Sequence, residues 1–213
     1  MQKPTPLKSP PQQYGLIDSV SPEHLHPKLP ALLYRQWLSV DETECLWLAA
    51  QALPWMHERL RCRGTWRTLK RKVVWMGDAG VCYAYSGRLH TPIPWTPEIE
   101  TVRQRLSQLL NVPFNSVLGN YYADGTQAMG YHQDNEPELG KSPCIASISL
   151  GATRRFRFRH LCSGETVTTD LPAGSLLVMQ DDCQQHWVHS LPPMRQSGAR
   201  INLTFRYIIR LHQ

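Results

Sequence analysis

The sequence predicts a mainly β domain with flanking helices, an α+β architecture built on a β-sandwich or jelly roll. Two segments with helical periodicity lie in the first half of the chain, and short strand-like runs between Gly- and Pro-containing turns follow Asn111. Helices followed by many short strands are typical of a sandwich or jelly roll with helices packed on it. The 213 residues suffice for one well-packed domain but not for two. We expect a flexible leader over residues 1–30 and a single domain over residues 31–213.

Each expected helix has a recognisable start. The first begins at Ser39 or Asp41, where the sequence offers a capping box, and ends at Leu53. The second begins at Pro97 behind Thr96 as the N-cap, and apolar residues follow at helical spacing. The proline-rich leader before them shows no sustained periodicity.

The expected strands lie mostly in the second half of the chain. Those after Asn111 cover residues 116–122, 144–150, 155–159, 165–170, 175–179, 186–191 and 201–209. An earlier hairpin is expected between residues 73–75 and 81–85, with the turn at residues 77–80.

The composition is that of a soluble globular protein, with 41% hydrophobic and 19% charged residues. No run approaches the roughly 20 apolar residues of a membrane-spanning helix, and the first residues lack the apolar core of a secretory signal. Six cysteines lie far apart without a Cys-x-x-Cys pair, which is typical of reduced thiols and argues against a zinc knuckle or a disulfide framework. We expect a monomer without a membrane partner, located in the cytoplasm, or in the nucleus if the source is a eukaryote.

Positive charge is concentrated in two clusters. The net charge of +6 fits a nucleic-acid partner without establishing one. One cluster spans residues 59–72 around Trp66, and in the other, residues 154–160, basic and aromatic residues alternate. The alternative for the first cluster is the solvated face of a hairpin.

Three residues are candidate ligands of an O₂-activating iron. In an extended segment His132 and Asp134 point to the same side, so both can bind one metal, although this pair alone is a weak indication. His189 can complete a face of two histidines and one carboxylate, which leaves three positions open for O₂ and a bidentate co-substrate. His186 is the competing third ligand; in a strand it faces away from His189, so only one of the two enters the site. A zinc site with an open position is the alternative.

A polar strand near the C-terminus favours an anionic co-substrate. By strand alternation four polar residues share one face: Arg200, Asn202, Thr204 and Arg206. Burying this face is costly unless it meets an anionic, hydrogen-bonding partner. A dicarboxylate such as 2-oxoglutarate is such a partner, because a guanidinium binds a carboxylate bidentately, whereas a metalloprotease has no use for this strand. The alternative is an exposed edge strand with solvated arginines.

Together these motifs resemble the AlkB family of 2-oxoglutarate dioxygenases. The similarity rests on His132-x-Asp134, His189 and residues 200–206, and it extends through residues 120–125, 145–153 and 171–177. It covers roughly residues 60 to 210 and is closest to the DNA- and RNA-repair members of the family. So many motifs in this order are far more specific than any one of them.

The resemblance implies a double-stranded β-helix (jelly-roll) core with an N-terminal nucleotide-recognition lid at residues 58–90. It implies that His132, Asp134 and His189 bind Fe(II), and that Arg200 pairs with the distal carboxylate of 2-oxoglutarate. The other residues implied around this co-substrate are Asn120, Tyr122, Asn202, Thr204 and Arg206, of which Arg206 is also catalytic because it lies next to the carboxylate that chelates iron. The alternative for Asn120 and Tyr122 is ordinary strand packing.

The implied reaction is oxidative dealkylation of bases such as 1-methyladenine and 3-methylcytosine in DNA, with RNA as the alternative. It consumes O₂ and 2-oxoglutarate and releases succinate, CO₂ and formaldehyde. The target methyl lies on the pairing edge, so the nucleotide is flipped out or single-stranded. By the family pattern Tyr85 stacks on the base and Tyr83 and Ser86 line its pocket, although aromatics at this spacing are otherwise more typical of a core. Glu136 is a candidate acceptor for an exocyclic amino group, with a solvated loop carboxylate as the alternative.

Two arginines of the first basic cluster are expected to contact the nucleic acid. Arg71, with the rest of residues 59–72, would contact phosphates that flank the flipped base. Arg63 stands where some duplex-specialised relatives carry an aromatic wedge before Gly-x-Trp, and an arginine can also stack in the gap. This departure leaves open the preference for duplex over single strands and for DNA over RNA.

Two other functions account for part of the sequence. A 2-oxoglutarate oxygenase acting on a protein or small molecule would keep the iron site but leave Tyr83, Tyr85 and residues 59–72 without a role. A non-catalytic nucleic-acid-binding module would not need the metal and co-substrate positions together. We therefore expect a base-repair dioxygenase.

Overall fold

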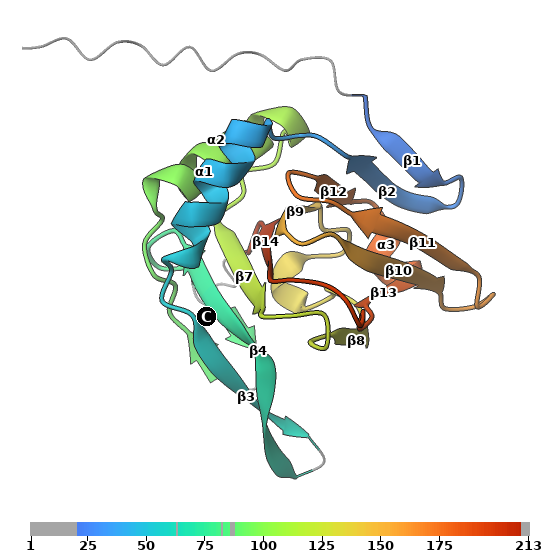
Figure 1. Cartoon of the computed structure of the whole chain (residues 1–213). Coiled ribbons are helices and arrows are strands. Elements are labelled where there is room, and N and C mark those ends of the chain that lie inside the picture. Colours follow the sequence, from blue (N-terminus) through green and yellow to red (C-terminus); the bar gives the residue numbers. More distant parts are fainter. Residues whose placement is uncertain (1–20, 63, 82, 86–87, 210–213) are drawn as a thin grey trace, which may run out of the picture.

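Two antiparallel β-sheets face each other in the computed structural model, which describes residues 21–209 except 63, 82, 86 and 87 (Figure 1). Within these residues the larger sheet has eight strands in the order β1 (Glu23–His26), β2 (Leu29–Tyr34), β12 (Leu176–Met179), β9 (Ile145–Gly151), β14 (Arg200–Arg206), β7 (Ser116–Tyr122), β4 (Thr65–Gly77) and β3 (Met56–Cys62). The smaller sheet has four described strands, in the order β11 (Thr166–Leu171), β10 (Arg154–His160), β13 (Trp187–Leu191) and β8 (Met129–His132). This pair of sheets is the predicted jelly-roll core.

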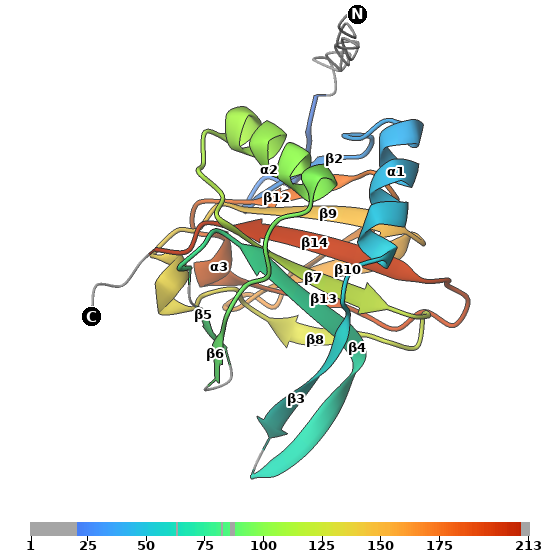
Figure 2. The same ribbon diagram turned by 90° about the vertical axis from the view of Figure 1, so that its left-hand side faces the viewer.

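Two helices, α1 (Val40–Gln51) and α2 (Pro97–Leu110), cover the outer face of the larger sheet (Figure 2). Leu46 of α1 and Leu106 of α2 belong to one buried apolar cluster with Ile201, Leu203 and Phe205 of β14. The predicted alternation in β14 is therefore confirmed, because these three residues face the helices and the polar residues between them face the smaller sheet. No helix among the described residues is long and apolar enough to cross a membrane.

The predicted helix starts are confirmed. The Glu42 N–H donates to the Ser39 hydroxyl at 3.2 Å, and the Ser39 N–H donates to the Glu42 carboxylate at 2.8 Å, which completes the capping box of α1. Helix α2 begins at Pro97 behind Thr96, although the Thr96 hydroxyl makes no capping hydrogen bond.

The seven strands predicted after Asn111 are all present, and nearly all of their ends lie within one residue of the prediction. The exception is the last strand, which ends at Arg206 because the chain then leaves the sheet. There the side chain of Asn115 accepts from the Ile208 N–H at 2.7 Å and donates to the Ile208 carbonyl at 2.8 Å. Strand β8 was not predicted.

Two predictions for the first half of the chain were wrong. Residues 73–75 do not pair with residues 81–85, because they belong to the 13-residue strand β4, which pairs with β3 and β7. Strand β5 (Tyr83–Tyr85) pairs instead with β6 (Arg88–His90). Residues 23–30, expected in the leader, form β1 and the start of β2, and Leu29 is buried in the core between the sheets.

Strand β3 and the first half of β4 project beyond the body of the molecule (Figures 1 and 2). We call residues 58–71 the arm. Its exposed described side chains include Arg59, Arg67 and Lys70, and the Arg59 guanidinium lies over the half-exposed Trp66 ring at 5.7 Å. The arm belongs to the segment expected as a nucleotide-recognition lid.

Candidate active site

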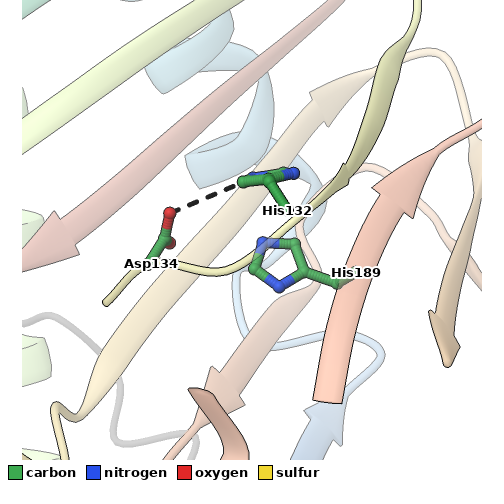
Figure 3. Close-up of side chains that lie close together, drawn as sticks. All are labelled: His132, Asp134 and His189. Atoms are coloured by element: carbon green, nitrogen blue, oxygen red, sulfur yellow. Dashed lines mark ion pairs between the residues drawn. The ribbon is translucent and has the colours of Figure 1, made fainter. Parts of the chain in front are cut away.

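Three potential metal ligands meet between the two sheets (Figure 3). His132 ends β8, Asp134 follows two residues later, and His189 lies in the middle of β13. The pairing of β8 with β13 places His132 opposite His189, with ring centroids 4.2 Å apart. One ligand atom from each residue lies within 4.8 Å of the others, and His132 Nε2 is 3.9 Å from Asp134 Oδ1. Two histidines and one carboxylate in this arrangement can bind a metal from one side.

His186, the competing candidate, lies outside this group. It is the last residue of the short helix α3 (Cys183–His186), and its Nε2 is 3.4 Å from Asp182 Oδ2 at the surface. The strand begins only at Trp187, so the predicted strand alternation between positions 186 and 189 was wrong. The geometry leaves His189 as the histidine that joins the group.

The surroundings keep Asp134 and His189 in the forms that bind a metal. Burial by itself would raise the pKa of Asp134, but Arg206 and the two imidazoles lower this pKa to about 2. Arg206 Nη2 donates to Asp134 Oδ2 at 2.9 Å. Burial lowers the pKa of His189 to about 3, although Asp134 opposes this shift. At neutral pH the Asp134 carboxylate is therefore ionised and the His189 imidazole is neutral, which are the forms that bind Fe(II).

The backbone at Asp134 is held by a buried side chain from another element. The Asp134 N–H donates to Gln184 Oε1 at 2.9 Å, and Gln133 Nε2 donates to the Gln184 carbonyl at 2.7 Å. Gln184 is 2% exposed and belongs to α3. These two bonds fix the chain immediately after β8, where regular strand pairing ends.

Neighbouring groups also orient the imidazoles. The Phe156 ring stacks on His189, with centroids 5.5 Å apart and an angle of 21° between the planes. His132 Nδ1 lies 2.9 Å from the Gly130 carbonyl. A proton on Nδ1, donated to this carbonyl, leaves Nε2 with a free lone pair toward Asp134.

A cavity of about 440 Å³ extends from the three ligands between the sheets. Its polar wall is the inner face of the larger sheet, lined by Arg200, Asn202, Thr204 and Arg206 of β14, Asn120 and Tyr122 of β7, and Ser147 of β9. In the register of the sheet Arg200 lies opposite Tyr122, and Asn202 opposite Asn120. The structure therefore brings all residues expected around the co-substrate to one cavity.

Arg200 places a buried positive charge at this wall. It is 2% exposed, its Nη2 donates to Ser149 Oγ at 2.9 Å, and its Nε has no hydrogen-bond partner within the described part of the chain. Burial lowers the pKa of Arg200 to about 10, so the guanidinium stays charged at neutral pH. A buried charge without a counter-charge is costly, and a ligand carboxylate that accepts two N–H groups offsets this cost. The site therefore fits a dicarboxylate such as 2-oxoglutarate.

Asn202 and Thr204 line the cavity, but the protein already uses their donors. Asn202 Nδ2 donates to Ser147 Oγ at 2.7 Å and to the Ile148 carbonyl at 3.0 Å. The Thr204 hydroxyl donates to Asn202 Oδ1 at 3.0 Å. The two Asn202 bonds join β14 to β9, and the Thr204 bond holds the Asn202 side chain in place within β14.

Arg71 lies in the cavity wall and not on an open surface. It is 7% exposed, and its Nε donates to Asn120 Oδ1 at 2.8 Å. Leu69, Val73 and Trp75, on the same face of β4, also line the cavity. This burial does not fit the expected contact of Arg71 with flanking phosphates, for which the exposed cations of the arm are better placed.

Glu136 contributes a negative group to the same cavity. Its Oε2 is buried and accepts no hydrogen bond from any residue that the structure describes. A buried carboxylate oxygen in this state favours a ligand that offers an N–H group. The alternative expected for Glu136, a solvated loop carboxylate, does not fit a buried oxygen.

The remaining substrate residues expected from the sequence cannot be placed. Arg63 and Ser86 lie outside the described residues. Tyr83 and Tyr85 form part of β5, but their side chains also lie outside what is described. Their contact with a base stays a prediction.

Sequence reasoning missed Gln184, Glu58 and Trp75. Strand alternation from Arg71 identifies Trp75 as a cavity residue once β4 is assigned its full length. Glu58 lines the cavity from β3, a strand that was not predicted. Nothing in the sequence near Gln184 indicates its contact with Asp134, 50 residues away.

The chain matches a known family model and several curated proteins. The model of the 2OG-Fe(II) oxygenase superfamily matches residues 30–206. The chain is 44% identical over 155 residues to "DNA oxidative demethylase ALKBH2" of Mus musculus, which covers 68% of this chain and 65% of the relative. It is 33% identical over 183 residues to "Alpha-ketoglutarate-dependent dioxygenase alkB homolog 3" of Homo sapiens, which covers 79% of this chain and 63% of the relative. The chain thus spans slightly less than two thirds of the length of these relatives.

A solved structure shows the same fold. The structure of OsALKBH1 superimposes with a TM-score of 0.59, covering 87% of this chain and 99% of that chain, at 17% sequence identity. At this identity the likeness concerns the fold alone. The family model covers most of the chain, and the relatives agree with it. The chain therefore belongs to the 2OG-Fe(II) oxygenase superfamily and, within it, to the AlkB family.

Proposed function

We propose that this protein is an Fe(II)- and 2-oxoglutarate-dependent dioxygenase that removes alkyl groups from nucleobases in DNA, such as 1-methyladenine and 3-methylcytosine. One observation supports this most strongly: a single cavity contains both the group of His132, Asp134 and His189 and a buried Arg200 without a carboxylate partner among the described residues. The relatives named as DNA oxidative demethylases support the choice of DNA.

The chain's own residues would each supply one requirement of this reaction. His132, Asp134 and His189 would hold Fe(II), which would supply the chemistry of oxidative dealkylation with O₂ and 2-oxoglutarate, whose products are succinate, CO₂ and, from a methyl group, formaldehyde. Arg206 keeps Asp134 ionised through their ion pair. Arg200 would bind the distal carboxylate of 2-oxoglutarate, and this contact would hold the co-substrate in one orientation.

The base would lie beside Glu136. Adenine and cytosine carry an exocyclic amino group on the pairing edge, and the buried Glu136 oxygen can accept a hydrogen bond from it. The base reaches this cavity only as a flipped or single-stranded nucleotide. Leu69 and Trp75 of β4 give the cavity apolar walls against which a base can pack.

The arm supports a nucleic acid over the other substrates considered. Its exposed Arg59, Arg67 and Lys70 are suited to phosphate contacts, and the half-exposed Trp66 to stacking. A protein or small-molecule substrate would leave these side chains without a role. RNA offers the same phosphates and bases, so it remains the alternative substrate. We also propose a monomer in the cytoplasm, or in the nucleus of a eukaryote.

The proposal is tested by direct turnover. Protein reconstituted with Fe(II) without oxygen, and then supplied with 2-oxoglutarate and O₂, is expected to remove one methyl group from oligonucleotides that contain 1-methyladenine or 3-methylcytosine. Mass spectrometry follows the oligonucleotide, while succinate and formaldehyde are measured in parallel, in single-stranded and duplex DNA and in RNA. If succinate forms while none of the oligonucleotides changes in mass, the substrate is not one of these nucleobases. The protein would then be a 2-oxoglutarate oxygenase that acts on another class of substrate.

The metal assignment predicts different effects for two nearby histidines. His189→Ala removes one of the three metal ligands. The Mn(II) affinity, measured by titration calorimetry, should therefore fall at least about a hundredfold, which is more than is usual when a residue that only hydrogen-bonds to a ligand is lost. His186→Ala is the matched control, because His186 is exposed and paired with Asp182, and it should leave Mn(II) affinity unchanged. Equal affinities in the two variants would contradict the assignment.

Arg200 is expected to control the co-substrate requirement. Arg200→Ala removes a charge-assisted bidentate contact, so the KM for 2-oxoglutarate should rise about 10- to 150-fold. Arg155→Ala, which removes an exposed arginine of β10, should leave this KM unchanged. Circular dichroism checks that both variants fold. An unaltered KM in folded Arg200→Ala would show that the co-substrate lies elsewhere.

Glu136 is expected to discriminate between bases. Glu136→Gln weakens the acceptor, so kcat/KM for 1-methyladenine and 3-methylcytosine should fall about 10- to 100-fold. The value for 3-methylthymine, which lacks an exocyclic amino group, should change much less. Glu138→Gln, in the neighbouring 3₁₀ turn (Pro137–Leu139) and outside the cavity lining, is the matched control. A uniform loss on all three bases would argue against a role in base recognition.

A further inference from the structure

A second buried arginine lies beside the same cavity wall as Arg200. Arg154 is the first residue of β10 and is fully buried. Its Cζ lies 5.8 Å from the centre of the Tyr122 ring, and the Arg200 Cζ lies 5.7 Å from the same centre. Two guanidinium groups therefore lie over one phenol ring, which itself lines the cavity.

Arg154 joins two loops that lie next to Tyr122 and Arg200 in the chain. Its guanidinium donates to the carbonyls of Gln127 at 2.8 Å and Pro192 at 2.9 Å, with longer contacts to Asp124 and Gly125 at 3.3 and 3.4 Å. The first loop connects β7 to β8, and the second connects β13 to β14. A single side chain thus links the segment that follows Tyr122 to the segment that precedes Arg200.

The two loops also contact each other directly. The Gly125 N–H donates to the Ser197 carbonyl at 2.9 Å, and the Met194 N–H donates to the Gly125 carbonyl at 2.8 Å. A Cβ at position 125 would lie 1.9 Å from the Met194 carbonyl oxygen, so only glycine fits. The junction between the loops is therefore tight, and Arg154 contacts it at the Gly125 carbonyl.

The charge of Arg154 is not balanced within the described residues. Its partners are neutral carbonyl groups, its Nε has no hydrogen-bond partner among them, and no ion pair to it is found there. Asp124 lies near, but its carboxylate is exposed and bound to Thr126. Arg154 and Arg200 consequently place two buried positive charges beside Tyr122, which lines the cavity, and an anionic ligand there would offset the cost of this arrangement.

We propose that Arg154 is a positioning residue for the co-substrate: it holds Tyr122 and the two loops in place and acts with Arg200 to receive the distal carboxylate of 2-oxoglutarate. This inference rests on the proposed function, which assigns that carboxylate to Arg200. Arg154 is not among the residues that line the cavity, so it acts through Tyr122 and the two loops. Preorganised positive charge of this kind favours a dicarboxylate over a ligand that carries only the chelating end.

The test compares two ligands that differ only in the distal group. 2-Oxoglutarate and 2-oxopentanoate share the 2-oxo acid end, but the second carries a methyl group in place of the distal carboxylate. Binding to the Mn(II)-loaded protein without O₂ is measured by titration calorimetry, so that no turnover is needed. Arg154→Gln should raise the Kd for 2-oxoglutarate about tenfold and the Kd for 2-oxopentanoate less than about twofold.

Two further variants separate the charge from the packing. Arg154→Lys keeps the charge but offers fewer donors, so the preference for the dicarboxylate should be partly retained. Gly125→Ala disturbs the loop junction without changing any charge, and it should weaken both ligands by similar factors. If Arg154→Gln does not fold, Arg154→Lys still decides, because a loss confined to 2-oxoglutarate supports the inference and an equal loss for both ligands overturns it. If the Arg154 variants raise the Kd for both ligands by the same factor, or leave both Kd values unchanged, the inference is overturned.

Arg200→Gln, measured in the same way, distinguishes this inference from the proposed function. Loss of the dicarboxylate preference in Arg200→Gln but not in the Arg154 variants would refute the role of Arg154 alone. Retention of the preference in Arg200→Gln would refute the assignment of the co-substrate to this wall, and the role of Arg154 with it.

Discussion

The buried ion pair between Arg206 and Asp134 connects the two halves of the site. Arg206 ends β14 in the larger sheet, whereas Asp134 follows β8 in the smaller one, so their contact at 2.9 Å joins the sheets where the cavity meets the metal ligands. The same contact lowers the pKa of Asp134 and keeps it ionised. The position and the charge of the Asp134 carboxylate therefore depend on one interaction. A displacement of one sheet against the other would alter this position and this charge.

Two buried atoms without a hydrogen-bond partner among the described residues, Arg200 Nε and Glu136 Oε2, give the cavity a polarity. The Arg200 guanidinium lies on the wall formed by β14, and the Glu136 carboxylate lies near the metal ligands, two residues after Asp134. Each favours a ligand group of opposite character, an anion in one case and an N–H donor in the other. A ligand without the matching group would leave a buried charge unpaired, so discrimination arises from the cost of the wrong ligand as much as from the contacts of the right one.

Sequence alone predicts what depends on local periodicity. The alternation at residues 200–206 predicts one polar and one apolar face, and the capping box at Ser39 predicts the start of α1, because both follow from neighbouring residues. The length of β4 and its pairing with β7 depend instead on contacts between residues 39 to 49 positions apart, with Lys72 opposite Tyr121 at one end and Gly77 opposite Ser116 at the other. The support of Asp134 by Gln184 is equally remote and has no pattern. Periodicity does not detect a four-residue helix, so it predicts a strand at His186, where the structure has the end of α3.

Strand β4 belongs both to the arm and to the cavity wall. Among the described residues its outer half pairs with β3 alone, whereas residues 72–77 pair with β7, and Arg71 lies where the two halves meet. There Arg71 holds Asn120 through a hydrogen bond of 2.8 Å. A ligand that displaced Arg71 by shifting the arm would alter the affinity of any ligand bound beside Asn120. Thermodynamic linkage would then make the reverse effect equal: occupancy of the inner cavity would change the affinity of the arm for that first ligand by the same factor.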